Sequence, residues 1–318
     1  MHRMKCFCIV FLGYFFGAPS FSQIQNGKFV FQNETCVTGY SAHIFMEINM
    51  MDARALANVL LQEILNNWAI NLNSQAVIYE DIDALIKDIR DGKVDFVVVT
   101  TPDYFLLRNQ VNLTPFLTYK IHDQILERIL LVSRIDSRIR SIVGLKKMKI
   151  VVYSDLSDEL NLSDLWFTTL VLRSGGNYSN DYASTVYKVR KGTNAISDVF
   201  FRRADAAVVP ERDFIISKEL NPQIGAQLSV IDSSKYMLYS VLCYTEKLTT
   251  SMARYHDRDM QSISDMLCNT NNTEIGKNFL SIFRVTSYVP FESTFLNDTE
   301  ALFNEHRALS TKRNRRSN

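Results

Sequence analysis

Two adjacent threonines, Thr100 and Thr101, stand where a buried strand is expected to end. The run from 94 to 99, apolar except for Asp95, precedes them, and Pro102 follows at once. A threonine hydroxyl can cap the next helix, and proline fits the first turn because no N–H donor is needed there. A helix that begins at a strand end directs free N–H groups toward polar, and especially anionic, ligands. Taken alone, however, the pair is better explained as a helix cap.

Similar polar residues follow two other predicted strands. Tyr40 and Ser41 come after CVTG, and Ser154 and Asp155 come after KIVVY. The carboxyl ends of strands in open α/β sheets are where ligands bind. Three polar clusters at such ends therefore predict a ligand cleft rather than three unrelated helix caps.

Carboxylates accompany these strand ends, at Asp103, Asp155 and Asp158. They would repel a purely anionic ligand, or they would pair with a positive group on it. A zwitterion would satisfy both the hydroxyls and the carboxylates, but solvent-facing aspartates would explain them as well. The charge of the ligand therefore stays open.

Motifs of common catalytic and nucleotide-binding sites are absent from the chain. It contains no GxGxxG, GxxxxGK[ST], GxSxG or HExxH. Beyond the first 22 residues the histidines are His43, His122, His256 and His306, and their spacing does not suit a metal site. We therefore expect no catalytic residues, no metal and no cofactor. The enzymatic alternative would require a carboxylate or lysine with a perturbed pKa in the cleft.

Helices and strands alternate along the chain, which predicts an α/β fold. Strands are predicted at 35–39, 75–79, 94–99, 125–133, 148–153, 185–189, 204–209 and 228–232. Most are separated by helical segments, so mostly parallel sheets are expected. Ser163 is the predicted cap of a helix that ends at Gly175, residues 218–227 are a predicted turn-rich break, and a last helix is predicted from about Asn297.

The first 22 residues have the layout of a cleavable export signal. Arg3 and Lys5 precede a 13-residue apolar stretch, and Ser20 and Ser22 stand before Gln23. Thirteen residues are too few for a helix that spans a bilayer, which needs about 20. We expect cleavage after Ser22 and a periplasmic protein that is not embedded in the membrane.

Net charge and cysteine content further limit the partners and the disulfides that this protein can have. Removing Arg3 and Lys5 from the 35 basic residues leaves 33 against 34 acidic ones, a net charge of −1, so no nucleic-acid partner is expected. Three cysteines remain, Cys36, Cys243 and Cys268, which favours buried thiols while leaving a Cys243–Cys268 bridge open. The basic tail, residues 306–318, is expected to be disordered.

Several stretches, in this order, make the chain similar to a known family. They are MDARALANVLLQEI, DALIKDIRDGKVDFVVVTTPDYF, RILLVSRIDSRIRSIVGLKKMKIVV, NAISDVFFRRADAAVVPERDFIISKELNPQIGAQLSVIDSS and TEIGKNFLSIFRV. The chain resembles the periplasmic phosphate/phosphonate-type substrate-binding proteins of ABC transporters. The resemblance implies a two-lobed type II periplasmic-binding-protein fold, in which each lobe is a mostly parallel sheet flanked by helices.

By the same resemblance, two hinge segments cross between the lobes near 118–123 and 232–234. Lobe I would comprise 23–120 plus 233–305, and lobe II would comprise 121–232. The implied ligand-binding residues are Tyr40, Ser41, Thr100, Thr101, Tyr104, Ser154, Asp155, Lys191 and Thr193. One departure from the family is the acidic loop SDLSDEL after the first strand of the second lobe, where phosphonate-binding members have a Ser/Thr-rich loop.

The resulting prediction is an exported, monomeric solute-binding protein. It would capture a small polar ligand, phosphate- or phosphonate-like, between the lobes and deliver it to an ABC transporter permease. The alternative on the same fold is a periplasmic ligand sensor that docks on a membrane receptor or kinase.

Overall fold

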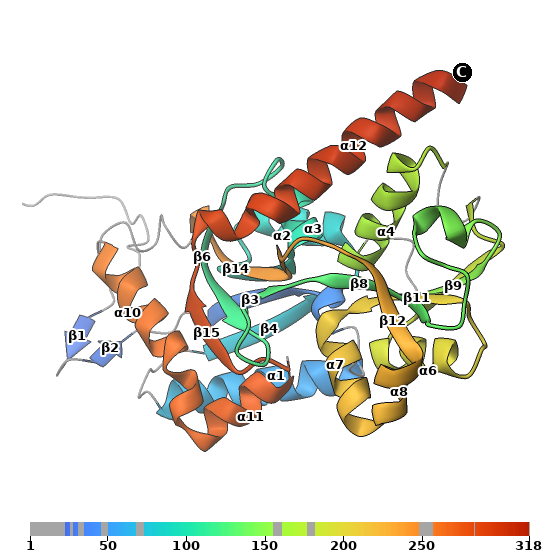
Figure 1. The fold of residues 1–318 in the computed structure, drawn as a ribbon. Helices are drawn as coiled ribbons and strands as arrows, with labels where there is room; N and C mark the ends of the chain where they lie inside the picture. The colour runs from blue at the N-terminus through green and yellow to red at the C-terminus, as the bar shows by residue number, and fades with distance from the viewer. Residues whose placement is uncertain are drawn as a thin grey trace, which may run out of the picture.

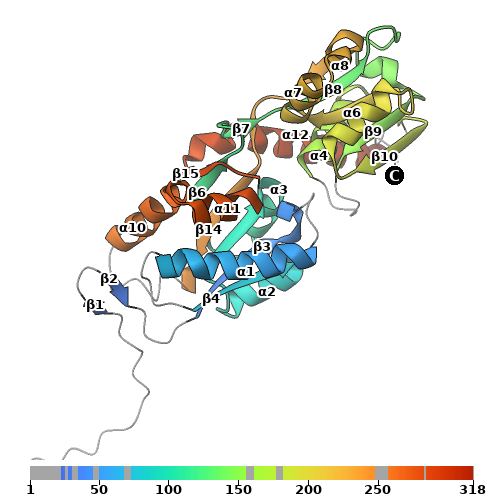
Figure 2. The same ribbon diagram turned by 90° about the horizontal axis from the view of Figure 1, so that it is seen from below.

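The computed structural model describes residues 23–25, 28–30, 35–45, 50–67, 73–154, 161–176, 182–247, 257–282 and 284–317. Most of these residues form two α/β lobes, which Figure 2 shows side by side. The predicted export signal, the acidic residues Asp155 and Asp158, and His256 lie outside the described residues.

Lobe I is built on a six-stranded sheet with the strand order β15-β6-β14-β5-β3-β4. Its strands are β3 (Thr35–Ser41), β4 (Asn73–Tyr79), β5 (Phe96–Thr100), β6 (Leu113–Lys120), β14 (Ser240–Thr245) and β15 (Ser287–Pro290). Its helices are α1 (Met50–Asn67), α2 (Ile82–Arg90), α3 (Thr101–Leu107), α10 (Asp257–Cys268) and α11 (Glu274–Ile282). Short 3-10 turns are η1 (Ala42–Phe45), η3 (Thr270–Asn272) and η4 (Ser293–Leu296), and β1 (Gln23–Gln25) pairs with β2 (Lys28–Val30).

The continuous apolar run before the double threonine is explained by burial on both faces of this sheet. Val98 packs with α1 and α11, whereas Val97 and Val99 pack with α2 and α3 on the opposite face. Successive strand residues point to opposite faces, so a strand covered on both sides needs an unbroken apolar sequence. Cys243 lies in the same core, and it, Cys36 and Cys268 are free thiols.

Lobe II is built on a five-stranded sheet with the order β10-β9-β11-β8-β12. Its strands are β8 (Ile129–Arg134), β9 (Lys149–Tyr153), β10 (Thr185–Val189), β11 (Ala206–Pro210) and β12 (Leu228–Ser233), and η2 (Ile142–Leu145) is a 3-10 turn. Its helices are α4 (Leu162–Arg173), α6 (Gly192–Phe200), α7 (Glu211–Leu220) and α8 (Pro222–Gln227). Helix α4 covers one face of the sheet, and α6, α7 and α8 cover the other.

Two segments connect the lobes and pair with each other. The first lies between the end of β6 at Lys120 and the start of β8 at Ile129, and the second lies between Ser233 and Ser240. Within them, β7 (Leu126–Glu127) and β13 (Met237–Leu238) form an antiparallel pair. The first crossing follows Lys120, inside the segment 118–123 that the family resemblance implied. The second follows Ser233, inside the implied segment 232–234.

Helix α12 (Asn297–Ser317) contacts both lobes, as Figure 1 shows. Near its start, Glu300 accepts a hydrogen bond from Arg108 of lobe I at 2.6 Å. Farther along, Glu305 accepts two from Arg173 of α4 at 2.9 and 2.8 Å. The prediction of a disordered tail is therefore wrong for residues 306–317, because the helix predicted from about Asn297 continues through them and packs against α4.

Three further expectations need correction. The sheets are mixed rather than mostly parallel, because strands next to the crossings, such as β14 and β8, run antiparallel to their neighbours. The predicted break at 218–227 is instead the end of α7 followed by α8, which begins with Pro222 after an Asn221 cap. Strands β6, β14 and β15 were not predicted.

Candidate functional site

The carboxyl ends of β3 and β5 bring polar residues of lobe I together. These strands are parallel neighbours, so Ser41 and Thr100 end at the same edge of the sheet. Both hydroxyls donate to one carboxylate oxygen of Asp103, each at 2.7 Å. His43 Nδ1 lies 3.0 Å from the same oxygen. Ser41, Thr100 and Asp103 are buried, so these charge-assisted hydrogen bonds form away from water.

The double threonine has two separate structural roles. Thr100 is the cap of α3, and its hydroxyl oxygen accepts from the N–H of Asp103 at 3.4 Å. The Thr101 hydroxyl donates to the carbonyl of Leu238 at 2.7 Å, and its N–H donates to the carbonyl of Tyr239 at 2.9 Å. The pair therefore both starts a helix and attaches the strand end to the second crossing segment.

Lobe II has a similar cluster at the end of β9. Ser154 donates a hydrogen bond to Asp164, whose carboxylate also lies 3.1 Å from the ammonium of Lys188. Burial raises the pKa of Asp164, while the Ser154 hydrogen bond and Lys188 oppose that rise. The cap of α4 is Asn161, which accepts from the N–H of Asp164 at 3.0 Å, so the prediction of Ser163 as the cap is wrong.

A third aspartate, Asp213 of helix α7, lies against the start of α6. Lys191 caps this helix without a side-chain hydrogen bond, and Gly192 is its first residue. A Cβ atom on Gly192 would lie 2.2 Å from a carboxylate oxygen of Asp213, so glycine is needed for this close approach. Lys191 is exposed and Thr193 is half-buried. Helices α3, α4 and α6 thus all have an aspartate of the chain at their first turn, where negative charge is stabilised.

The two predicted tyrosines lie away from the polar clusters. Tyr40 packs in the core beneath α1, with its ring centroid 5.7 Å from that of Phe45, and burial raises its pKa. Tyr104 packs in the core on the other face of the sheet, near the Arg108 guanidinium. Of the predicted residues, the structure therefore brings Ser41 and Thr100 together directly, and it places Ser154, Lys191 and Thr193 at the corresponding edge of lobe II.

A largely buried ion pair at the crossing segments was not predicted from sequence. Glu127 of β7 accepts a hydrogen bond from Arg212, at the start of α7, at 2.7 Å. Arg212 also approaches the Tyr153 hydroxyl at 3.5 Å. Burial raises the pKa of Glu127 to about 7, although Arg212 opposes the rise. No local signal reveals the pair, because its members are 85 residues apart.

A small pocket of about 20 Å³ lies beside this ion pair, where lobe II meets the crossing segments. Its lining includes Glu127, Tyr153, Asn161, Ser163, Met237 and Tyr239. Tyr153 and Asn161 lie at the carboxyl edge of the lobe II sheet, and Glu127, Met237 and Tyr239 come from the crossings. The pocket therefore lies where movement of the crossings would reshape it.

The perturbed pKa of Glu127 gives a testable pH dependence. Because the folded-state pKa is about 7 and the ordinary value is 4.5, the folded state holds this proton more tightly than the unfolded state. The resulting stabilisation is present below about pH 4.5 and is lost as the pH rises through about 7. Between pH 5 and pH 8 we expect the wild type to lose up to about 3 kcal/mol relative to Glu127→Gln, measured by urea unfolding. Parallel pH profiles for the two proteins would contradict this assignment.

Within the described residues, no three His, Cys, Asp or Glu side chains are grouped as a metal site would require. In the same part of the chain, no helix is both long and apolar enough to cross a bilayer. Two lobes joined by paired crossings, with polar strand ends at the carboxyl edges of their sheets, define a bilobal solute-binding protein of the type II periplasmic class.

Comparison with protein families identifies the family. The model of the family described as "ABC transporter, phosphonate, periplasmic substrate-binding protein" matches residues 54–294. The chain belongs to this family, whose members are periplasmic proteins that bind small ligands and deliver them to ABC transporter permeases. The family and the class of function predicted from sequence are therefore confirmed. No curated protein matches the chain in sequence.

Solved structures share the fold at low sequence identity. A Xanthomonas citri protein solved bound to ATP is 15% identical, with a TM-score of 0.61, over 87% of this chain and 98% of that one. PhnD1 of Prochlorococcus marinus, solved with methylphosphonate, is 13% identical, with a TM-score of 0.57, over 86% and 98%. A binding protein of a phosphonate ABC transporter from Pseudomonas aeruginosa is 13% identical, with a TM-score of 0.55, over 90% and 99%. These matches confirm the predicted type II fold.

Proposed function

We propose that this protein captures a small zwitterionic ligand between its lobes and delivers it to an ABC transporter permease, without catalysing a reaction. The observation that supports this ligand class is the hydrogen bonding of the hydroxyls at the strand ends. Ser41 and Thr100 donate to Asp103, and Ser154 donates to Asp164. A hydroxyl has one donor and two acceptor positions, so these groups retain only acceptor capacity for a ligand.

A ligand that binds these hydroxyls must therefore donate hydrogen bonds, as an ammonium group does. Asp103 and His43 are near the lobe I hydroxyls, and Asp103 would add attraction for a positive group. On lobe II, Lys191 is exposed at the carboxyl end of β10 and suits the anionic end of the same ligand. An aminoalkyl phosphonate or sulfonate has both groups, and the family relationship supports a phosphorus or sulfur oxyanion.

Thermal shift of residues 23–318 tests the ligand class with methylphosphonate, 2-aminoethylphosphonate, 2-aminoethylsulfonate and ethylamine as probes. A ligand at 100 times its Kd stabilises the folded protein by about 2.7 kcal/mol, a shift of several degrees. We expect the aminoalkyl oxyanions to shift the Tm most, and Thr100→Val to remove the shift. Thr114→Val, on an exposed part of β6, is the matched control and should keep it.

Other outcomes separate the remaining alternatives. A larger shift with methylphosphonate than with its amino derivative would overturn the zwitterion assignment but not the binding function. No shift with any probe would favour a different ligand, or the sensor alternative. The proposal also places the protein in the periplasm as a monomer after cleavage following Ser22, which the mass of the exported protein and size-exclusion chromatography would test.

A further inference from the structure

The edge of the lobe II sheet opposite the candidate site is formed by two segments, 134–149 and 200–205. Strand register places them there, because Thr185 pairs with Lys149 and Ala206 pairs with both Ile150 and Ser133. Strands β9, β10 and β11 therefore begin at this edge and end at the edge that carries Ser154. We call the two segments the distal edge.

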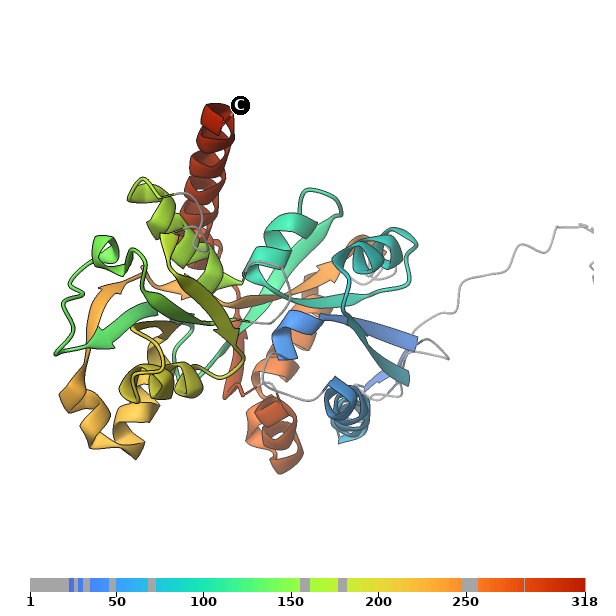
Figure 3. The ribbon, with the colours of Figure 1, turned by 90° about the vertical axis from the view of Figure 1, so that its right-hand side faces the viewer.

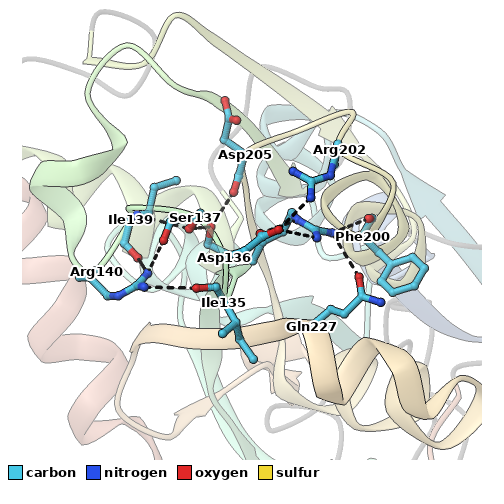
Figure 4. A network of polar contacts seen from close by, with 11 residues as sticks. Ile135, Asp136, Ser137, Ile139, Arg140, Phe200, Arg202, Asp205 and Gln227 are labelled. Carbon is cyan, nitrogen blue, oxygen red and sulfur yellow. Dashed lines mark hydrogen bonds and ion pairs between the residues drawn. The ribbon is translucent and has the colours of Figure 1, made fainter.

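A network of polar contacts holds the distal edge together, as Figure 4 shows. Asp136 pairs with Arg134 at 2.9 Å and with Arg202 at 2.8 Å, which joins the two segments. Arg134 also donates to the carbonyl of Phe200 at 2.9 Å. Arg140 donates to the carbonyls of Ser137 and Ile135 at 2.6 and 3.2 Å, which closes the loop after β8 on itself. These contacts thus hold the two segments of the distal edge in a fixed arrangement.

The charge of the distal edge is strongly positive. Its two segments contain eight lysines and arginines and two carboxylates, a net formal charge of +6 in a chain whose total is +1. Arg138, Arg140, Lys146 and Lys147 are exposed, and within the described residues none forms an ion pair with a carboxylate. This charge is therefore available to an external partner.

The end of α12 extends the same basic surface. Arg313 donates to the carbonyl of Gly176 at 2.8 Å, and Gly176 packs closely against Tyr182, whose hydroxyl donates to the carbonyl of Ile142 in the distal edge. Residues 307–317 contain five lysines and arginines and no carboxylate. Figure 3 shows this end of the helix projecting from the body of the protein. Arg307 and Lys312 lie on its exposed face.

Large apolar side chains are exposed among these cations. Val143 is 66% exposed, Phe201 64% and Ile135 48%. Cations mixed with exposed apolar residues are typical of surfaces that lie on anionic bilayers, where headgroups attract the charges and the acyl boundary accepts the apolar side chains.

We propose that the distal edge and the end of α12 bind reversibly to anionic phospholipid surfaces. The protein would then be concentrated at the membrane while the candidate site, at the opposite edge of the lobe II sheet, stays open to ligand. The proposal does not depend on the identity of the ligand. Charge neutralisation at the distal edge should therefore leave a ligand-induced thermal shift unchanged.

Co-sedimentation with vesicles tests the proposal, with phosphatidylcholine alone or with a third of phosphatidylglycerol. We expect binding only to the anionic vesicles, with most of it lost between about 0.05 M and about 0.5 M salt. Combining Arg138→Gln, Lys146→Gln and Lys147→Gln should weaken binding by roughly a hundredfold, since each cation near the surface contributes about a factor of five. Arg307→Gln with Lys312→Gln on α12 should weaken it independently, which keeps the test valid if the first variant is unstable.

The matched control removes three exposed cations from lobe I, by Arg54→Gln, Lys87→Gln and Arg90→Gln, and should bind as the wild type does. Equal loss in this control would show that only net charge matters and would overturn the assignment of a surface. Absence of binding at low salt, or equal binding to uncharged vesicles, would overturn the proposal itself. Binding to soluble polyglutamate but not to vesicles would indicate an acidic protein partner instead.

Discussion

Replacing Arg212 with methionine is expected to lower the free energy of unfolding by about 3–5 kcal/mol near pH 8. The change leaves the Glu127 carboxylate, which is only 18% exposed, without its counter-ion, and this costs more than the loss of an exposed ion pair. Urea unfolding gives the free energy directly. At pH 5 the cost should be smaller, because Glu127, whose pKa is already about 7 beside Arg212, then holds its proton.

Two further variants make this expectation specific to the pair. Combining Arg212→Met with Glu127→Gln should restore most of the lost stability, because no uncompensated charge remains. Arg202→Met breaks a pair with Asp136 in which both side chains are more than half exposed. Its cost should be much smaller than that of Arg212→Met, because water and salt screen an exposed ion pair. A pH-independent cost for Arg212→Met, or no recovery in the double variant, would mean that packing rather than charge explains the effect.

Replacing Asp103 with alanine should have the second-largest effect, about 3 kcal/mol of unfolding free energy. Two buried hydroxyls would lose their acceptor, and His43 would lose its carboxylate partner. Hydrogen bonds to a charged group contribute about 1.5–3 kcal/mol each, and part of the loss would be recovered as the hydroxyls find other partners. The freed hydroxyls could then donate, so the proposed preference for an amino group on the ligand should weaken.

Asp83 provides the control for this change. It is also an aspartate in the first turn of a helix, α2, but it is exposed. Asp83→Ala should cost less than about 1 kcal/mol, the size of a helix-dipole interaction at a surface. Similar costs for the two variants in urea unfolding would show that Asp103 acts only on the helix dipole and not as the shared acceptor of Ser41 and Thr100.

Local patterns in the sequence predicted most of the core strands and most of the helices. The apolar runs of β5 and β11 predicted strands, and the double threonine with Pro102 predicted the start of α3. Such signals depend on neighbouring residues, so they can be read without the fold. Antiparallel strands such as β14 and the helical end of α12 lacked these signals, because contacts with distant parts of the chain stabilise them.

The sequence by itself determined the class of this protein: two α/β lobes with polar residues at their strand ends, in the order typical of a substrate-binding family. Only the tertiary structure decided what those polar residues do. Ser41 and Asp103 are 62 residues apart and Glu127 and Arg212 are 85 apart, yet each pair is within hydrogen-bonding distance. A hydroxyl in the sequence can donate or accept, and its partner is fixed only when separate strands and helices pack together. For that reason the proposed ligand class rests on the fold rather than on any motif.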